Sequence, residues 1–318
     1  MPREEDWISV HAFYQGDLDR LLVGPVDGLM AELSRAGLID RWFFLRYWDG
    51  GPHVRLRVLP AGQTARQAVE SLLFRDFRRY FAAHPSQNRL TEPEYLRMAQ
   101  ELARWEGLTS YAPRQWPNNS LQRLPYRREH RRYGAGASME AAERHFGESS
   151  ELVMQVLRKG PTRERRLVGA YAMILLGWFA CLDAPAELAA TIGATGSRLE
   201  RPPDVWLGHA TDMLRIAANA ELLRQEGTLI AWFRSVRALA DVVETQIDSG
   251  GFDPPVRGWE GSRPVAETSA RGRAVGVLDI CAHLACNRLG VTLAEESAVR
   301  ELAVRAVGAL AGRSAVAP

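Results

Sequence analysis

A four-residue turn between two β-rich segments is the feature that most constrains the fold of this chain. Residues 49–52 (DGGP) follow the segment 41–47 (RWFFLRY) and precede the segment 53–59 (HVRLRVL). Glycine supplies the positive φ angles that a tight hairpin needs, so the two segments are predicted to pair as antiparallel strands. Residues 53–59 are therefore predicted to be the returning strand of a hairpin.

Strand and helix patterns alternate on both sides of this hairpin. Residues 7–14 are β-rich and predict a strand, and residues 17–38 carry apolar side chains at helical spacing, with Pro25 as a point where that helix can be interrupted. Further helices are predicted at 64–83 and 92–106. The order β-α-β-β-α predicts an antiparallel sheet with helices on one face, in a ferredoxin-like arrangement.

The chain from Ser138 onward has a helical pattern. Residues 116–136 are predicted to hold loop and strand, and Ser138 is predicted to cap the next helix, with Ala141 in place of the glutamate of a full capping box. Helices are expected at 139–158, 162–182, 203–224, 226–248, 269–289 and 293–312. The predicted fold class is α+β: a ferredoxin-like antiparallel sheet half, residues 1–136, packed on a larger helical half, residues 137–318, as one integrated unit.

Composition and charge exclude several classes of protein. The formal net charge of +2 gives little support to an electrostatic nucleic-acid partner. The three cysteines lack CxxC spacing, which argues against a disulfide framework or a zinc site and fits a reducing compartment. The longest apolar run, 167–182, is shorter than the roughly 20 residues of a membrane span and predicts a buried core helix. With a polar, acidic start instead of a signal peptide, the chain is predicted to be cytoplasmic, without a membrane partner.

Residues 53–59 carry the most informative polar pattern. Side chains alternate along a strand, so His53, Arg55 and Arg57 share one face of it. One interpretation is a solvated basic face, which is common in antiparallel sheets. The other is that the helical half covers this face, so that the three side chains line a cleft and bind carboxylates or peptide carbonyls.

A second polar pattern lies in the apolar helix predicted over 269–289. His283 is followed one turn later by Asn287, which could orient its imidazole, and then by Arg288. A single histidine on such a helix is more often a core residue than a catalyst. The grouping of a histidine, an amide and a guanidinium is nevertheless more polar than packing requires and favours a site.

Other features give weaker signals. The Gly- and Pro-rich segment 248–273 carries Trp259, which either stacks on an aromatic ligand or anchors the loop by burial. His11 and His145 are interpreted as structural. The chain has no P-loop, GxGxxG, HExxH or GxSxG motif, so nucleotide-binding, zinc-protease and serine-hydrolase functions lack their required parts.

Three of these segments together carry a resemblance to a known family. Residues 43–57 (FFLRYWDGGPHVRLR), 126–146 (YRREHRRYGAGASMEAAERHF) and 283–290 (HLACNRLG) resemble the signature blocks of the thiopeptide-type bacteriocin biosynthesis family. The same blocks mark the elimination domain of class I lanthipeptide dehydratases. The sequence departs from the pattern at 134–136, where GAG replaces paired glycines.

The resemblance implies one of two activities. Elimination domains remove glutamate from a glutamylated serine or threonine, and the matching residues are Arg55, Arg57, Arg132 and His283. Pyridine synthases instead join two dehydroalanines in a formal [4+2] aza-cycloaddition, with loss of water and the leader peptide. The opening segment 7–22 and the tryptophan-bearing form of the hairpin resemble the synthases, which are therefore favoured. A third alternative is a non-catalytic protein that binds the leader peptide.

The resemblance also implies a set of site residues. His283 is expected to move protons, and Arg55, Arg57 and Tyr133 to donate hydrogen bonds, with His283 across a cleft from Arg55. The substrate-binding residues are expected to be His53, Arg46, Arg132, Glu129, Trp259, Asn287 and Arg288. No cofactor or metal is required. The expected partners are a ribosomally made precursor peptide, with a leader and a core of thiazoles and dehydroalanines, and other enzymes of the pathway.

Overall fold

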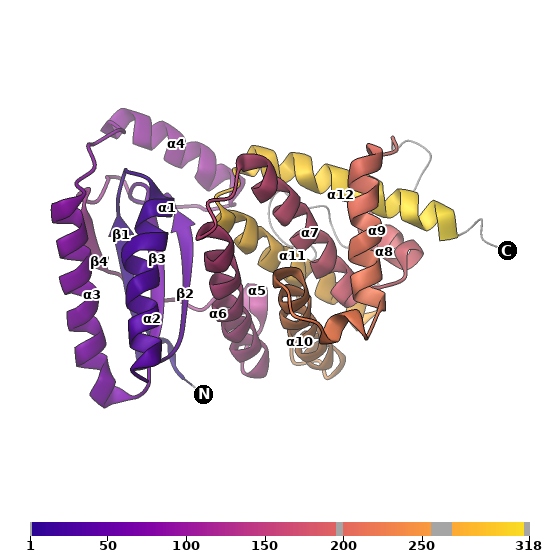
Figure 1. Ribbon diagram of the computed structural model, residues 1–318, viewed down its shortest axis with the longest axis horizontal. Helices are drawn as coiled ribbons and strands as arrows, with labels where there is room; N and C mark the ends of the chain where they lie inside the picture. Colours follow the sequence, from indigo (N-terminus) through magenta and orange to yellow (C-terminus); the bar gives the residue numbers. More distant parts are fainter. Residues whose placement is uncertain (1, 195–199, 256–268, 315–318) are drawn as a thin grey trace. The chain divides into compact units, whose positions relative to one another are not determined.

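The structure is a computed structural model that describes residues 2–194, 200–255 and 269–314 (Figure 1). It divides into two compact units. Unit 1 holds the described residues up to Arg128 together with Val153–Gly160, and unit 2 holds Glu129–Leu152 and the described residues from Pro161 onward.

Unit 1 is built on a four-stranded antiparallel sheet. Its strands are β1 (Ile8–Phe13), β2 (Ile39–Tyr47), β3 (His53–Pro60) and β4 (Ser120–Arg123), in the order β2-β3-β1-β4. All three strand pairs are antiparallel. This order and direction, with helices after β1 and β3, is the ferredoxin-like topology, so the predicted fold class is confirmed.

The hairpin between β2 and β3 depends on its two glycines, as the sequence predicted. Gly50 and Gly51 have φ angles of +83° and +107°, which side chains rarely tolerate. The backbone N–H of Gly51 donates to the carbonyl of Trp48 at 2.8 Å. A Cβ atom at Gly50 would also lie 2.5 Å from Cδ1 of Trp116, so the turn and its packing both require glycine there.

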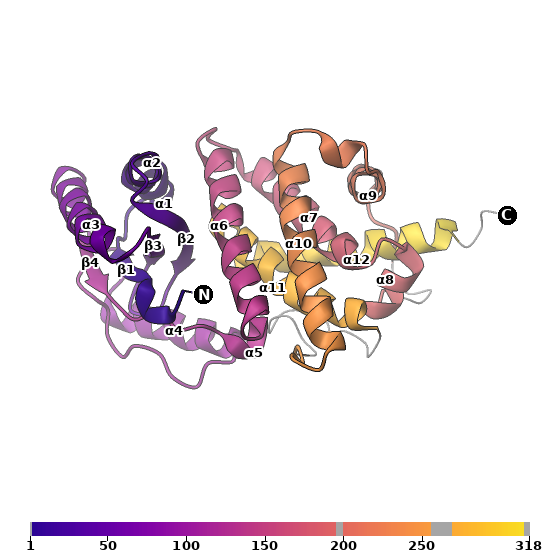
Figure 2. The same cartoon turned by 90° about the horizontal axis from the view of Figure 1, so that it is seen from below.

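One face of the sheet is covered by the helices of unit 1. Val10, Val54 and Leu56 point to this face and are fully buried. Helices α2 and α3 contact the strands, as the ribbon shows (Figures 1 and 2). The helical segments of unit 1 are η1 (Glu4–Asp6), α1 (Leu18–Leu21), η2 (Leu22–Val26), α2 (Asp27–Arg35), α3 (Gln63–Ala83) and α4 (Glu92–Trp105). The predicted helix over 17–38 is interrupted at Pro25, which lies in the π-helical turn η2.

Unit 2 is helical, with α7 at its centre. Its elements are α5 (His130–Tyr133), α6 (Ala137–Leu157, which continues into unit 1), α7 (Arg163–Cys181), α8 (Pro185–Thr191), α9 (Asp204–Ala218), η3 (Leu222–Arg224), α10 (Thr228–Asp248), α11 (Ala270–Leu289) and α12 (Leu293–Ser314). α7 packs against α9, α10, α11 and α12 (Figure 2). Residues 170–181 are all buried, which confirms the core helix predicted from the apolar run.

None of the described helices is by itself long and apolar enough to cross a bilayer. Helices α7 and α8, with a bend of 101° between them, reach that length and apolar character only when taken together.

Two local predictions in unit 2 were wrong, and one helix was not predicted. Ser138 lies inside α6, because Glu140 N–H already bonds to the carbonyl of Gly136 and the helix begins at Ala137. The helix predicted over 203–224 ends at Ala218, because the backbone of Asn219 is extended. The side-chain oxygen of Asn219 accepts hydrogen bonds from the backbone N–H groups of Glu221 and Leu222. The short helix α8 was not predicted at all.

Candidate functional site

The polar face of β3 lies opposite to the face that α2 and α3 cover. The register places His11 of β1 across from Arg55, and Phe13 across from His53. On the other side, Tyr47 of β2 pairs with His53. His11, His53, Arg55 and Arg57 therefore share one face, and we call these four residues the His–Arg cluster.

Hydrogen bonds fix both histidines of the cluster in defined tautomers. Arg57 donates from Nη2 to Nε2 of His11 at 3.0 Å, so the neutral His11 ring carries its proton on Nδ1. His53 Nδ1 lies 2.8 Å from the carbonyl of Gly51 and must donate to it. His11 Nδ1 and His53 Nε2 are buried and have no hydrogen-bond partner among the described residues. The two rings stack with their centroids 4.8 Å apart, so the N–H donor at Nδ1 of His11 and the acceptor at Nε2 of His53 belong to adjacent rings.

Burial controls the charges in the His–Arg cluster. The pKa of His53 is lowered to about 3, mainly by burial; the hydrogen bond to Gly51 opposes this shift, and the charges of Arg55 and Arg57 add to it. Burial and the charge of Arg57 likewise lower the pKa of His11. The pKa of Arg57 is lowered to about 9, mainly by burial and then by Arg55. At neutral pH the histidines are therefore neutral and the arginines charged.

Aromatic rings surround the arginines. The guanidinium carbon of Arg55 lies 3.3 Å from the ring centroid of Tyr47, and that of Arg57 lies 5.6 Å from the ring centroid of Tyr126. The hydroxyl of Tyr47 donates to Glu106 at 2.6 Å, which holds this ring in place. Burial and then the Glu106 charge raise the pKa of Tyr47, so the hydroxyl stays protonated.

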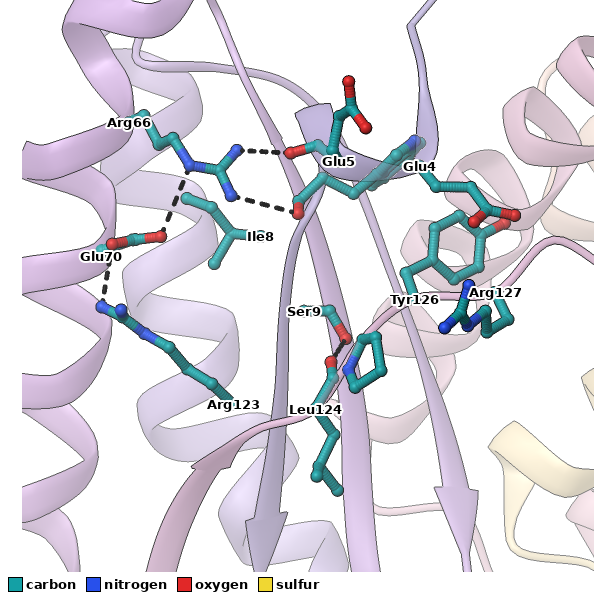
Figure 3. Close-up of a pocket in the computed structure, with 12 residues that line it drawn as sticks. Glu4, Glu5, Ile8, Ser9, Arg66, Glu70, Arg123, Leu124, Tyr126 and Arg127 are labelled. Atoms are coloured by element: carbon teal, nitrogen blue, oxygen red, sulfur yellow. Dashed lines mark hydrogen bonds and ion pairs between the residues drawn. The ribbon is translucent and has the colours of Figure 1, made fainter.

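A pocket of about 440 Å³ opens beside the start of β1 in unit 1 (Figure 3). Arg66 of α3 donates to the carbonyls of Glu5 and Asp6, both at 3.0 Å. Glu70 accepts from Arg123 at 2.8 Å, so these charges are paired across the pocket. Tyr126 lines the pocket and also faces Arg57, so the pocket and the His–Arg cluster share this ring.

One residue predicted for the same site lies elsewhere. Arg46 pairs with Val54 in the register and therefore lies on the opposite face of the sheet, where its guanidinium bonds to Asp19 at 2.5 Å. The structure does not bring it to the His–Arg cluster. Trp259 lies outside the described residues.

The polar residues of α11 that were predicted as one group point in two different directions. Nδ1 of His283 lies 2.9 Å from Oε2 of Glu296 on α12. Arg288 is fully buried and donates from Nη1 to the hydroxyl of Ser149 on α6 at 3.0 Å. Asn287 lies one turn after His283 and is half-buried. His283 and Arg288 are therefore on different faces of α11 and contact different helices.

Glu296 belongs to a buried chain of polar contacts that the sequence did not reveal. Its Oε1 accepts from Nε of Arg300 at 2.8 Å, and Arg300 also pairs with Asp279 of α11. The indole N–H of Trp178 donates to the same Asp279 oxygen at 2.9 Å. Burial raises the pKa of Glu296, but the charges and hydrogen bonds of His283 and Arg300 lower it by more, so the carboxylate is ionised.

Tyr133 and Arg288 lie around the ring of Phe146 in unit 2. Tyr133 packs edge-on to Phe146 at 5.0 Å, and the guanidinium of Arg288 lies 6.0 Å from the same ring. Burial raises the pKa of Tyr133 well above its usual value, so its hydroxyl is a donor at neutral pH. Burial also lowers the pKa of Arg288 to about 10. Glu129 and Arg132, just before Tyr133, pair at 2.9 Å near the surface.

The sequence predicted a structural role for His145, which is buried among polar side chains. Nδ1 of His145 lies 2.8 Å from the hydroxyl of Ser235, which donates to Glu148. Burial and then the charge of Arg288 lower the pKa of His145 to about 3, so the ring is neutral. Among the described residues, no three His, Cys, Asp or Glu side chains are grouped so that they could hold a metal ion.

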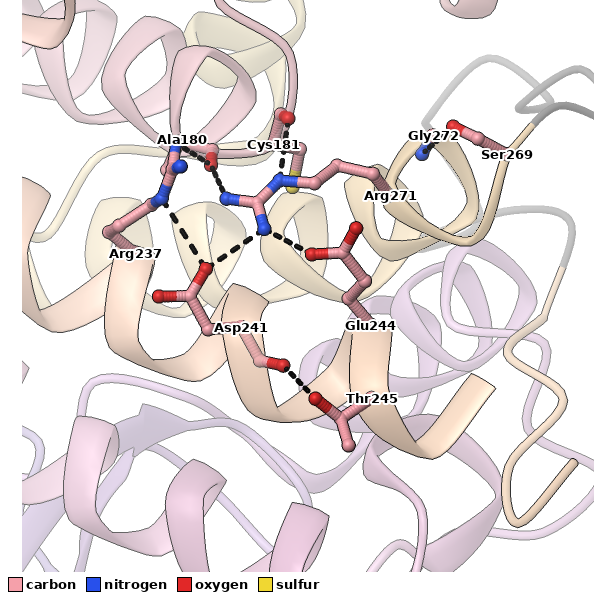
Figure 4. A network of polar contacts seen from close by, with 9 residues as sticks. All are labelled: Ala180, Cys181, Arg237, Asp241, Glu244, Thr245, Ser269, Arg271 and Gly272. Atoms are coloured by element: carbon pink, nitrogen blue, oxygen red, sulfur yellow. Dashed lines mark hydrogen bonds and ion pairs between the residues drawn. The ribbon is translucent and has the colours of Figure 1, made fainter. Parts of the chain in front are cut away.

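A further polar network binds the last carbonyl groups of α7 (Figure 4). Arg271 of α11 donates to the carbonyls of Cys181 and Ala180 at 2.9 and 3.1 Å, and its guanidinium pairs with Asp241 and Glu244 of α10. Arg237 donates to the Ala180 carbonyl as well. Because the last carbonyls of a helix lack intrahelical donors, these arginines satisfy them. This network is structural.

The fold and the site identify the chain as a two-unit α+β protein with a buried His–Arg cluster on its sheet. The chain belongs to the family described as lantibiotic biosynthesis dehydratase C-term, which it matches over residues 7–307. Among curated protein sequences, none matches the chain significantly.

Several solved structures share this fold. The pyridine synthase TbtD from thiomuracin biosynthesis is 19% identical, with a TM-score of 0.71 over 96% of this chain and 99% of that one. TsrL is 16% identical, with a TM-score of 0.62 over 98% and 99%. The tRNA-dependent lantibiotic dehydratase MibB from Microbispora sp. 107891 is 20% identical, with a TM-score of 0.57, but this chain covers only 29% of it.

Proposed function

We propose that the protein is a thiopeptide pyridine synthase. It would join two dehydroalanines of a modified precursor peptide in a formal [4+2] aza-cycloaddition, with loss of water and of the leader peptide. The observation that carries this proposal is the end-to-end likeness to a pyridine synthase, over 96% of this chain and 99% of that one. The likeness to the dehydratase covers only 29% of the dehydratase.

The chemistry of the His–Arg cluster supports the proposal. The cycloaddition requires one amide to become an imidate-like 2-azadiene, with both alkenes held at near-attack distance. Arg57 is buried and charged, and within the described part of the chain it donates to neutral acceptors, the carbonyl of Leu56 and Nε2 of His11. Such a cation stabilises an oxygen on which negative charge develops. Arg55 would act beside it.

The resemblance to the family also assigns roles to residues of unit 2. His283 would transfer protons and Tyr133, whose hydroxyl stays protonated, would donate a hydrogen bond. His53, Glu129, Arg132 and Asn287 would bind the peptide. Arg46 lies on the opposite face of the sheet, and Arg288 is fully buried against Ser149, so we assign these two residues to structure. We propose that the reaction needs neither a metal nor a cofactor, because it relies on positioning.

Glutamate elimination is the second candidate function. The family description itself refers to a dehydratase, and Arg57, a buried arginine that pairs with no carboxylate among the described residues, also suits the side chain of a glutamyl ester. In that reaction Arg55 and Arg57 would hold the leaving glutamate and His283 would move the proton.

One pair of substrates separates these functions. The purified chain alone is given a precursor that already carries two dehydroalanines and its azoles, and separately a glutamylated precursor. A synthase releases the leader as a C-terminal amide from the first, and the core gains the ultraviolet absorption of an azole-substituted pyridine. Loss of glutamate from the second, without pyridine formation, would establish the elimination function instead. Binding of both leaders without either reaction would indicate a leader-binding protein.

A further inference from the structure

The contact between His283 and Glu296 joins a part-exposed imidazole to a fully buried carboxylate. The His283 side chain is 19% exposed, whereas that of Glu296 is 1% exposed. Nδ1 of His283 lies 2.9 Å from Oε2 of Glu296. A carboxylate can only accept a hydrogen bond, so the proton of a neutral imidazole must lie on Nδ1, which leaves the lone pair on Nε2.

The position of Glu296 is itself fixed. Its second oxygen accepts from Nε of Arg300 at 2.8 Å, and both side chains lie on α12. Arg300 is held in turn by Asp279, through the side-chain pair and through a 3.1 Å bond to its carbonyl. Both oxygens of Glu296 are therefore engaged by donors, and rotation of the carboxylate would break two hydrogen bonds.

We infer that Glu296 is the positioning residue that holds His283 in the tautomer with a proton on Nδ1, so that Nε2 is the atom that accepts protons from substrate. The inference deepens the proposed function and rests on it for the role of His283. In that role Nε2 takes the N–H proton of the substrate amide, the negative charge passes to the amide oxygen, and the buried carboxylate stabilises the imidazolium that forms.

The same geometry predicts what an amide at position 296 would do. In Glu296→Gln the N–H of Arg300 requires an acceptor, so the amide oxygen turns to Arg300 and the NH₂ group faces Nδ1 of His283. The amide then donates where the carboxylate accepted, and the neutral ring must carry its proton on Nε2. The substitution keeps the shape of the side chain but places the lone pair on the wrong nitrogen.

The tautomer is measured by NMR on the full chain labelled with ¹⁵N-histidine, with the signals of His283 identified by their loss in His283→Asn. We expect the proton on Nδ1 in the neutral ring of the wild type and on Nε2 in Glu296→Gln. The kcat for pyridine formation should fall about 10²- to 10⁴-fold, with KM changed far less.

Glu295→Gln is the matched control. It removes the same charge from the adjacent residue of α12, where Glu295 pairs with Arg163 and not with His283. We expect the His283 tautomer and the turnover of this variant to be those of the wild type.

The outcomes separate this inference from the proposed function. A proton on Nε2 in the wild type overturns the inference without any variant, so the test does not depend on whether Glu296→Gln folds. An unchanged tautomer in folded Glu296→Gln also overturns it. A changed tautomer with wild-type turnover supports the positioning by Glu296 and contradicts the proposed role of His283 in the reaction.

Discussion

Arg57 and His11 lie on neighbouring antiparallel strands and form a 3.0 Å hydrogen bond from a charged guanidinium to a neutral imidazole. Both side chains are buried. Placing a cation in such a position without a carboxylate disfavours folding, because the lost hydration is not replaced by an ion pair. The arrangement is explained if a substrate group with developing negative charge meets Arg57 during the reaction.

Arg57→Met should lower turnover without lowering stability. The loss of one positioned donor to a developing oxyanion typically costs about 10²- to 10³-fold in kcat. The free energy of unfolding should fall by no more than about 1 kcal/mol, because relief from burying the guanidinium offsets the lost bond to His11. Urea unfolding and pyridine formation measure the two effects.

Arg75→Met is the control for this variant. Arg75 lies on α3 in the same unit, and its side chain is 60% exposed. We expect no change in turnover. If Arg57→Met retains full turnover, or if the protein loses several kcal/mol of stability, Arg57 is a structural residue and the proposed role is wrong.

Stability should fall as the pH is lowered below about 6.5. In the unfolded chain His11, His53 and His145 take up protons near that pH, whereas in the folded chain burial lowers their pKa values, to about 3 for His53 and His145. The unfolded state therefore binds more protons between these values. Each histidine contributes a slope of up to about 1.4 kcal/mol per pH unit.

Urea unfolding between about pH 6.5 and about pH 5 measures this dependence of stability on pH. Most carboxylates remain ionised in that range, so the histidines dominate the change. His145→Gln should reduce the slope by the contribution of one histidine. A flat profile in the wild type would mean that the buried rings are protonated in the folded state.

Local sequence patterns predicted most elements of the fold. The hairpin at Gly50 and Gly51 and the buried helix α7 follow from backbone preferences and from apolar periodicity, which are properties of short segments. The start of α6 was missed because Ser138 has the side chain of a helix cap, yet the helical hydrogen bonds already begin at Gly136.

Contacts between distant segments could not be predicted from the sequence. His11 joins Arg57 only because β1 pairs with β3, and a strand order is set by the packing of the whole sheet. Glu296 was missed although it and His283 lie at similar distances on either side of Gly290. That symmetry suggests proximity, but the direction of each side chain depends on how α11 and α12 turn about Gly290.

Arg271→Met should lower stability and leave turnover unchanged. The side chain donates to two carbonyls at the end of α7, and its loss leaves buried acceptors without these donors (Figure 4). Such a loss costs about 1–3 kcal/mol. Arg273→Met, two residues later, should have little effect, because the partner of Arg273 within the described residues is the exposed Asp253. Equal unfolding free energies for the two variants would show that the α7 carbonyls do not depend on Arg271.

His283→Gln should abolish most of the turnover while the fold persists. A neutral amide cannot accept and return a proton, and loss of a positioned acid–base group typically costs about 10²- to 10⁴-fold. The side chain is part-exposed, so its replacement should be tolerated, and circular dichroism should match the wild type. His209→Gln, a part-buried histidine of α9 in the same unit, provides the comparison and should react at the wild-type rate. Turnover is followed by the absorption of the pyridine and by mass spectrometry of the released leader amide. Wild-type rates in folded His283→Gln would make His283 a core residue whose pair with Glu296 serves stability alone, and would remove the acid–base step from the proposed mechanism.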